Sequence, residues 1–371
     1  MSWHTTYGLI SVLEQRLRKG RRGAQVRPFC VQAKICHRGY SQPLQRALAD
    51  FGADHSFGEA TKKVHEHYGV DVPTSGARTW TLAHAKASGA VEHEAPKEPV
   101  EKLITEMDGT MLPIVATKTG PELDGRKAKE LFWREARLCL ARDVDAVDGV
   151  YGATFGTAQI AGLLWHQVAE TAGLGAVTRV HGLGDGAKWI INTFHEQFAT
   201  GQESTVTYTV DFHHVSDYLA AAAKEVAPAN NTAWLHQQQE ALKQNRGGEV
   251  LDALAPHREP ERQKKEPPKE ASPERDHKEP PREGPSKEAP VRSAYNYIQE
   301  RRQYMDYAGA LAADLPIGSG EVEGSHRYVL QHRLKIAGAW WLERNAECML
   351  QLRVVRANGD WDKYWAEIAM N

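Results

Sequence analysis

Residues 178–198, TRVHGLGDGAKWIINTFHEQF, decide the fold that we predict for this chain. The segment is typical of a strand, a glycine corner and a helix in succession, with Asp185 at the corner. Residues 204–226, STVTYTVDFHHVSDYLAAAAKEV, repeat the same order, with Asp211 at their corner. Two such units in succession indicate an α/β domain whose first strands lie upstream.

Three more strands are predicted ahead of this segment. Residues 103–118, LITEMDGTMLPIVATK, alternate around the turn signal Asp108–Gly109 and therefore predict two paired strands. Residues 131–145 form a possible third strand, and an apolar helix is expected from about residue 157 to 172. One face of that helix carries Ile160, Leu163, Leu164 and Val168. This order of elements predicts an RNase H-like domain, an α/β fold with a mixed five-stranded sheet and helices on its faces.

Length and composition bound the other possibilities. The 371 residues are enough for two or three domains, and 41% hydrophobic and 25% charged residues indicate a mostly globular chain. No apolar run reaches membrane-spanning length and no secretory signal is present, so we expect a soluble cytoplasmic protein with no membrane partner. Cys30 and Cys36, with His37, lack a second ligand pair at zinc-finger spacing, and we interpret the four cysteines as plain thiols.

The N-terminal residues are predicted to contact DNA. Residues 1–40 are expected to be a basic arm, since the chain has nine Lys or Arg residues and one acid between Glu14 and Arg46. The net charge of −2 hides this asymmetry. Such a density of positive charge is typical of contact with a polyanion, although solvated basic tails are also common.

Residues 41–89 are predicted to form an all-α domain of three short helices. The first helix ends at Gly52, the second follows Ser56 and ends at Gly69, and the third begins near Ser75. Two helices joined by a short turn match a helix-turn-helix, and a structural three-helix bundle is the alternative. The third helix is rich in hydrogen-bond donors, namely Arg78, Thr79, Trp80, His84 and Lys86. We expect its two fixed positive charges, at positions 78 and 86, to contact DNA.

Two further segments are expected to separate the folded parts. Residues 90–100 are polar with two prolines and predict a linker. Residues 227–314 predict a mostly helical insertion, within which residues 256–290 hold nine of the 18 prolines and no aromatic or large aliphatic residue. Because that segment cannot bury enough surface to offset chain entropy, we predict it to be a disordered linker. Residues 101–226 and 315–371 would then be the two parts of the catalytic core.

Three acids are predicted to meet at one site. In an RNase H-like sheet the first strand lies beside the fourth, so Asp108 near the first and Asp185 at the end of the fourth would be neighbours. Glu323, at the start of a late helix, is the candidate third acid. Three carboxylates can hold two divalent cations about 4 Å apart. We expect Mg²⁺ (or Mn²⁺), because Mg²⁺ prefers oxygen ligands. Each acid also has an ordinary interpretation: a hairpin turn, a helix cap and a favourable charge on the helix dipole, respectively.

Asp211 is the alternative to Asp185 as the second acid. It also ends a predicted strand, and His213 follows closely. The fifth strand lies farther from the first than the fourth does, so Asp185 ranks above Asp211. Asp211 and His213 remain candidates for lining the site, where they would orient a phosphate or a metal-bound water.

Residues 317–341, IGSGEVEGSHRYVLQHRLKIAGAWW, predict a glycine turn followed by a basic helix. We expect Glu321 to lie in the turn and Glu323 to head the helix. Contacts to backbone phosphates are expected from Arg327, Arg333 and Lys335. Trp340 or Trp341 would stack on an unpaired base, with packing in the core as the favoured alternative.

Six segments carry a family resemblance: DFGADHSFGEA at 50–60, MDGT at 107–110, HGLGDGAKWI at 181–190, VDFHHVSDYL at 210–219, LPIGSGEVEGSHRYVLQHRLKIAGAWW at 315–341 and LRVVRANGDWDKYW at 352–365. Together they resemble the ISKra-type bacterial insertion-sequence transposases, which are related to the wider Mutator-like DDE group. The resemblance covers most of the chain from about residue 40 onward. Residues 256–290 and the residues before 40 depart from the family pattern.

The resemblance implies cut-and-join chemistry on transposon ends by an RNase H-like core with a helical insertion. The family's three acids fall on Asp108, Asp185 and Glu323. The expected function is therefore a DNA transposase that binds terminal repeats and target sites in double-stranded DNA, in the bacterial cytoplasm and at the nucleoid. Because the reaction brings two ends together, we expect a homo-oligomer, at least a dimer on DNA. The alternatives are an RNase H-like nuclease, which would not need the N-terminal module, and a catalytically silent DNA-binding protein descended from a transposase.

Overall fold

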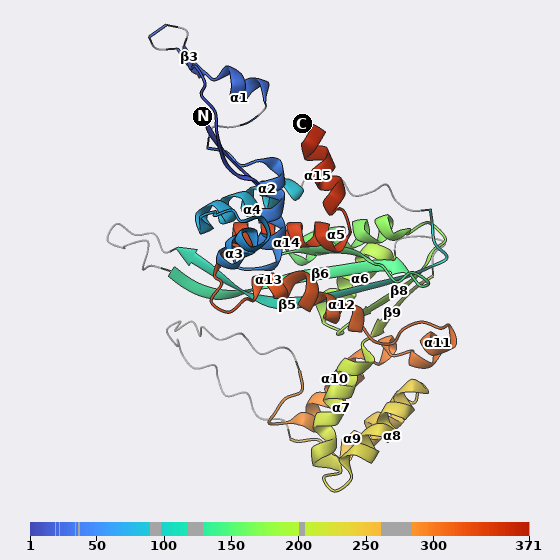
Figure 1. The fold of residues 1–371 in the computed structure, drawn as a ribbon. Helices are drawn as coiled ribbons and strands as arrows, with labels where there is room; N and C mark the ends of the chain where they lie inside the picture. The colour runs from blue at the N-terminus through green and yellow to red at the C-terminus, as the bar shows by residue number, and fades with distance from the viewer. Residues whose placement is uncertain are drawn as a thin grey trace. The chain divides into compact units, whose positions relative to one another are not determined.

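The computed structural model describes residues 1–18, 20–21, 23–33, 35, 38–89, 98–117, 129–199, 205–260 and 284–370. The chain divides into two compact units. Figure 1 labels the helices and strands of both. One unit combines Met1–Glu92 with Val329–Asn371, and the other is His93–Tyr328. We expected all of 315–371 to belong to the catalytic core. Its larger part, from Val329 onward, instead packs with the N-terminal helices.

Five strands of the unit 93–328 form a mixed sheet in the order β7-β6-β5-β8-β9. The strands are β5 (Lys102–Thr117), β6 (Lys129–Asp143), β7 (Val150–Thr154), β8 (Arg179–Gly184) and β9 (Val206–Val210). The pairs β5–β6 and β6–β7 are antiparallel, and β5–β8 and β8–β9 are parallel. The chain is therefore a mixed α/β protein in which the first strand of this unit lies beside the fourth.

The hairpin predicted at Asp108–Gly109 is wrong, because β5 runs straight through it. Asp108 pairs with Leu138 and Gly109 pairs with Arg137 across β6. A two-residue hairpin of this type needs positive φ angles at its centre, and neither residue has one. The glycine serves packing instead, since a Cβ at position 109 would lie 2.5 Å from the Glu135 side-chain oxygen Oε1. The predicted strand at 131–145 is the second strand, β6, and β7 is the strand that the sequence pattern missed.

The helices that follow the strands agree with their predicted positions. They are α5 (Ala158–Ala172), α6 (Lys188–Phe198) and α7 (Phe212–Val226). The apolar face predicted for α5 is wrong in part, because Ile160 and Leu163 are 51% and 66% exposed. The buried face of α5 consists of Ala161, Gly162, Trp165, Val168, Ala169 and Ala172. Small side chains let α5 lie close to β6, β7 and α6, so the larger aliphatic residues did not mark the packed side.

The insertion after α7 is helical, as predicted. Its elements are α8 (Asn231–Lys243), α9 (Gly247–Leu254), η1 (Ala255–His257), α10 (Pro290–Arg301), η2 (Arg302–Tyr304) and α11 (Tyr307–Ala312). Residues 261–283, most of the predicted disordered segment, lie outside the described residues. Its described ends are ordered: the carboxylate of Glu259 accepts hydrogen bonds from the backbone N–H groups of Val291 and Arg292 at the start of α10. The disorder predicted for the ends of 256–290 is therefore wrong, because an acid satisfies orphan helix donors there.

In the other unit the three predicted N-terminal helices are present as α2 (Gln42–Asp54), α3 (Phe57–Tyr68) and α4 (Thr74–Ser88). The predicted stop at Gly52 is wrong, because α2 continues through it to Asp54. A Cβ at position 52 would lie 2.2 Å from the Thr81 hydroxyl oxygen on α4. That hydroxyl donates a hydrogen bond to the Leu48 carbonyl at 3.0 Å. Glycine at this position permits the close approach of α2 and α4 and does not end the helix.

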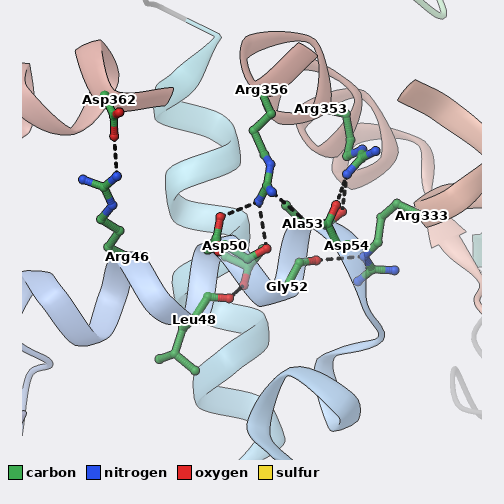
Figure 2. A network of polar contacts seen from close by, with 11 residues as sticks. Arg46, Leu48, Asp50, Gly52, Ala53, Asp54, Arg333, Arg353, Arg356 and Asp362 are labelled. Atoms are coloured by element: carbon green, nitrogen blue, oxygen red, sulfur yellow. Dashed lines mark hydrogen bonds and ion pairs between the residues drawn. The ribbon is translucent and has the colours of Figure 1, made fainter. Parts of the chain in front are cut away.

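The C-terminal segment completes this unit with α14 (Glu343–Ala357) and α15 (Trp361–Met370). Figure 2 shows its arginines at the C-terminal end of α2. Arg356 binds the Asp50 carboxylate at 2.7 Å and the Asp54 carboxylate at 2.9 Å, and Arg353 also pairs with Asp54. Positive charges at a helix C-terminus are favourable, because the last carbonyl groups of the helix have no partners within it.

The remaining elements are short. Residues 1–40, expected as a basic arm, contain β1 (Ser2–Thr5), β2 (Gly8–Ser11), β3 (Leu17–Arg18), β4 (Gln25–Val26) and α1 (Pro28–Gln32). Near the C-terminal end lie α12 (Gly320–Ser325), the π-helical turn η3 (His326–Gln331), α13 (His332–Leu334) and β10 (Trp341–Leu342). Within the described part of the chain, no helix has the length and apolar character needed to cross a membrane.

Candidate functional site

Asp108, Asp185 and Glu323 line one cavity of about 670 Å³ in the unit 93–328. Asp108 lies in the middle of β5, Asp185 follows the last residue of β8, and Glu323 lies on α12. The parallel pairing of β5 with β8 brings the first two acids to the same region of the sheet. The cavity thus gathers three carboxylates that are far apart in the sequence.

Asp108 is held by two neighbours. Its Oδ1 accepts a hydrogen bond from the backbone N–H of Gly109 at 2.7 Å. Its Oδ2 lies 3.1 Å from Nε2 of His326, at the start of η3. His326 is only 2% exposed, so its ring is fixed by its surroundings. This histidine is not among the site residues predicted from the sequence, although it follows Glu323 by less than one helical turn.

Asp185 sits at a corner that requires glycine. Its Oδ1 accepts a hydrogen bond from the backbone N–H of Ala187 at 2.8 Å. Gly186 has a φ of +79°, and a Cβ there would lie 2.9 Å from Cδ of Arg301. Arg301 donates to the Gly186 carbonyl at 2.8 Å, and the Tyr297 hydroxyl donates to the Asp185 carbonyl. Two side chains of the helical insertion therefore fix the backbone that carries Asp185.

The helix that bears Glu323 is docked by a buried acid of β5. Oε2 of Glu106 accepts the backbone N–H of Val322 at 2.8 Å. Glu106 is 1% exposed, and this burial raises its pKa to about 8, with smaller contributions from nearby carboxylates. The side chain is therefore mostly protonated at neutral pH and places little charge in the interior. Glu106 precedes Asp108 by two residues, so both side chains lie on one face of the strand. Glu106 is not among the predicted site residues, and its two-residue spacing from Asp108 is the signal in the sequence that points to it.

Glu321 and Glu323 have different surroundings on α12. Glu321 accepts a hydrogen bond from Nε of Arg142 on β6 at 2.8 Å. The expectation that Glu321 lies in the turn before the helix is wrong, since α12 begins at Gly320. Of the two acids only Glu323 lines the cavity. The structure therefore favours Glu323 as the member of the acid cluster.

Asp211 has both carboxylate oxygens in hydrogen bonds. Oδ1 accepts the backbone N–H groups of His213 and His214 and so caps α7. Oδ2 accepts the backbone N–H of Ser319 at 2.6 Å and also its hydroxyl. Asp211 borders the cavity together with His214, but it is 1% exposed and ties α7 to the start of α12. His213 packs against Gly318 and is not among the residues that line the cavity.

The three acids fit a divalent cation by chemistry, because carboxylate oxygens are the ligands that Mg²⁺ prefers. Their present arrangement is more open than a metal site: among the described residues, no three His, Cys, Asp or Glu side chains are grouped closely enough to hold an ion. One oxygen of Asp108 faces His326, and one oxygen of Asp185 faces Ala187.

The residues expected to contact DNA divide into exposed and buried groups. Arg78 and Lys86 are exposed on the outer side of α4, and Arg327 is exposed on η3. Lys335 is half-buried. The prediction for Arg333 is wrong, because its side chain is 1% exposed.

Arg333 is buried because it closes the end of α2. Its Nε donates to the Gly52 carbonyl at 2.8 Å (Figure 2), and its guanidinium lies 4.8 Å from the ring centre of Phe57 and 4.7 Å from that of Trp341. Burial lowers its pKa to about 10, which still leaves it charged at neutral pH. Trp341 is accordingly a core residue, whereas Trp340 is 58% exposed.

His84, one of the donors expected on the third helix, is also buried. Its Nδ1 lies 2.8 Å from the Tyr364 hydroxyl, and its Nε2 lies 3.0 Å from Oε1 of Gln45. The ring of Trp365 lies 4.5 Å away. His84 therefore belongs to the core of its unit and cannot reach a DNA base.

Comparisons with known proteins leave the family of this chain unassigned. No protein-family model matches the chain, and no curated protein matches its sequence. Among solved structures, the chain is similar to the Drosophila P element transposase strand transfer complex, with a TM-score of 0.39 and 8% sequence identity. The match covers 90% of this chain and 96% of that one.

Proposed function

We propose that this chain is a DNA transposase with an RNase H-like catalytic core. The observation that supports the proposal is one cavity lined by acids from β5, the end of β8 and α12. The strand order, with β5 between an antiparallel and a parallel neighbour, is the order expected for such a core. The resemblance of six segments to the ISKra-type, Mutator-related transposases points to the same chemistry.

In this proposal Asp108, Asp185 and Glu323 are the acids that would hold two Mg²⁺ or Mn²⁺ ions. When bound, such ions activate a water or a 3′-hydroxyl and stabilise the leaving oxygen of the phosphodiester. The remaining residues hold the acids in place. His326 faces Asp108, the glycine corner holds Asp185, and Glu106 fixes the helix that carries Glu323.

DNA recognition is proposed for the unit that contains α4. Arg78 and Lys86 are exposed and lie eight residues apart, about 80° apart around the helix axis, so both project from one half of the helix. Double-stranded DNA from transposon ends and from the target would be the partner. Joining two ends in one reaction requires at least two copies of the chain, and we place the reaction in the bacterial cytoplasm, at the nucleoid.

The proposal is tested with purified protein, Mg²⁺ and labelled DNA that carries both ends of the element encoding the chain. We expect strand transfer by the wild-type protein and none by Asp108→Asn or Asp185→Asn. Asp217→Asn is the matched control, because Asp217 is an exposed acid on α7 that does not line the cavity. Cleavage of RNA–DNA hybrids without strand transfer would support an RNase H-like nuclease. Binding of DNA ends with no cleavage would support a catalytically silent DNA-binding protein.

A further inference from the structure

An aromatic side chain, Trp189, lines the same cavity as the three acids. It lies in the first turn of α6, four residues after Asp185, and is half-buried. The guanidinium of Arg137 lies over its ring, 4.8 Å from the ring centre. Arg137 also pairs with Glu135, another residue of the cavity wall, at 2.5 Å. The indole is therefore held in a defined place beside the acids.

The cavity wall around Trp189 suits a nucleotide better than a small apolar molecule. Lys188 and Arg301 also line it, and Met111 adds an apolar surface from β5. Proteins bind single-stranded nucleic acid with cations near an aromatic ring, because a base stacks on the ring and the cations attract the phosphates. Lys188 lies 3.4 Å and Arg301 3.6 Å from the carboxylate of Glu300, so part of the charge of both cations is balanced in the free protein.

We propose that Trp189 stacks on an unpaired base next to the phosphate that is cut, so that the preferred substrate is a DNA end whose terminal base pairs are open. This inference rests on the proposed function, since it places the scissile phosphate at the three acids. The tryptophans that the sequence pattern put forward for this role are Trp340 and Trp341. Trp341 is buried against Arg333, and neither residue lines the cavity, whereas Trp189 does.

The test compares two DNA ends that differ only in pairing: a fully paired duplex and the same duplex with two unpaired terminal nucleotides. One of the unpaired nucleotides is 2-aminopurine, whose fluorescence falls when it stacks. Binding is measured in Ca²⁺, so that the result does not depend on cleavage. Stacking of one base on an aromatic ring corresponds to a loss of about 5- to 150-fold in affinity when the ring is removed.

We expect Trp189→Ala to bind the open end about 5- to 150-fold more weakly than the wild type and to bind the paired duplex with the wild-type affinity. Trp189→Phe should keep most of the affinity, and the wild-type protein should quench 2-aminopurine. Equal binding of both ends by Trp189→Ala and wild type would overturn the inference, as would a loss specific to Trp340→Ala. If Trp189→Ala does not fold, unquenched 2-aminopurine in the wild-type complex overturns it instead. Failure of the wild-type protein to bind either DNA would overturn the proposed function as well. The results named before it overturn only the inference about Trp189, so the two failures can be told apart.

Discussion

At the scale of single residues, the acid cavity depends on side chains that do not themselves line it. His326 and Glu106 are both almost fully buried. His326 contacts the carboxylate of Asp108, and Glu106 accepts a hydrogen bond from Val322 on the helix that carries Glu323. Supporting partners of this kind orient metal-binding carboxylates, and their loss typically lowers metal affinity about 10- to 100-fold. The two residues are therefore separate points at which the site can be weakened.

The contact of His326 with Asp108 gives the first prediction. If the three acids bind Mn²⁺ as proposed, His326→Ala should lower the Mn²⁺ affinity about 10-fold or more, because Asp108 loses the ring that faces its Oδ2. His326→Gln, which retains a donor, should recover part of the affinity. Calorimetric titration with Mn²⁺ measures both, and His332→Ala, an exposed histidine on α13, is the control. Unchanged affinity in a folded His326→Ala protein would contradict a positioning role.

His84 gives a prediction about pH. Burial lowers its pKa from 6.5 to about 4 in the folded state, so folding holds the ring neutral. The stability that depends on the neutral ring is complete above pH 6.5 and is lost as the pH falls toward 4, a loss of about 3 kcal/mol. Urea unfolding at pH 7.5, 6 and 5 should show this decline in the wild type. His84→Gln should reduce the slope, and an identical slope in both proteins would show that another group titrates.

At the scale of the elements, sequence patterns located most helices and strands and the neighbouring first and fourth strands, but not the contacts between segments far apart in the chain. The order of strands and helices from residue 102 to 226 follows from local periodicity, which is why most of those elements were predicted. The Asp108–Gly109 hairpin was not formed, because pairing with the long strand β6 outweighs a local turn signal. The role of Arg333 could not be predicted, because its carbonyl partner on Gly52 lies 281 residues away.

The contact between α2 and α4 gives a prediction in which two effects have opposite signs. Alanine is better than glycine inside a helix by about 1 kcal/mol, so an unhindered glycine-to-alanine change should stabilise. At Gly52 the new Cβ would lie 2.2 Å from the Thr81 hydroxyl, so Gly52→Ala should destabilise by about 1–3 kcal/mol. Gly58→Ala on α3, which meets nothing within 4 Å, is the matched control and should not destabilise.

Thermal unfolding of the two variants and of Gly52→Ala/Thr81→Ala measures this balance. The double variant should be less destabilised than the sum of its single changes, because Thr81→Ala removes two of the three atoms that the new methyl group meets. Additive effects would mean that the close approach of α2 and α4 is not the cause.

At the scale of the whole molecule, the unit with the three N-terminal helices is built from both ends of the chain. The chain leaves this unit near residue 92 and returns to it at Val329, directly after the helix that carries Glu323. Sequence patterns placed these C-terminal residues with the catalytic core because the family motif runs from 315 to 341 without a break. Contacts between elements far apart in the sequence, such as α14 and α4, show that these C-terminal residues pack with the N-terminal helices.

This grouping predicts that residues 1–89 do not fold stably without residues 329–371. The shared core contains Ala49 from α2 with Val355, Tyr364 and Trp365 from the C-terminal helices. The C-terminal end of α2 also depends on the arginines of α14 (Figure 2). A protein in which a flexible linker joins 1–89 to 329–371 should give a cooperative thermal transition by circular dichroism, and 1–89 alone should not.

The Arg353→Ala/Arg356→Ala variant of the joined protein should unfold several degrees lower, because Asp54 loses both of its arginine partners. A cooperative transition in 1–89 alone would show that the N-terminal helices form an independent domain, as the sequence had suggested.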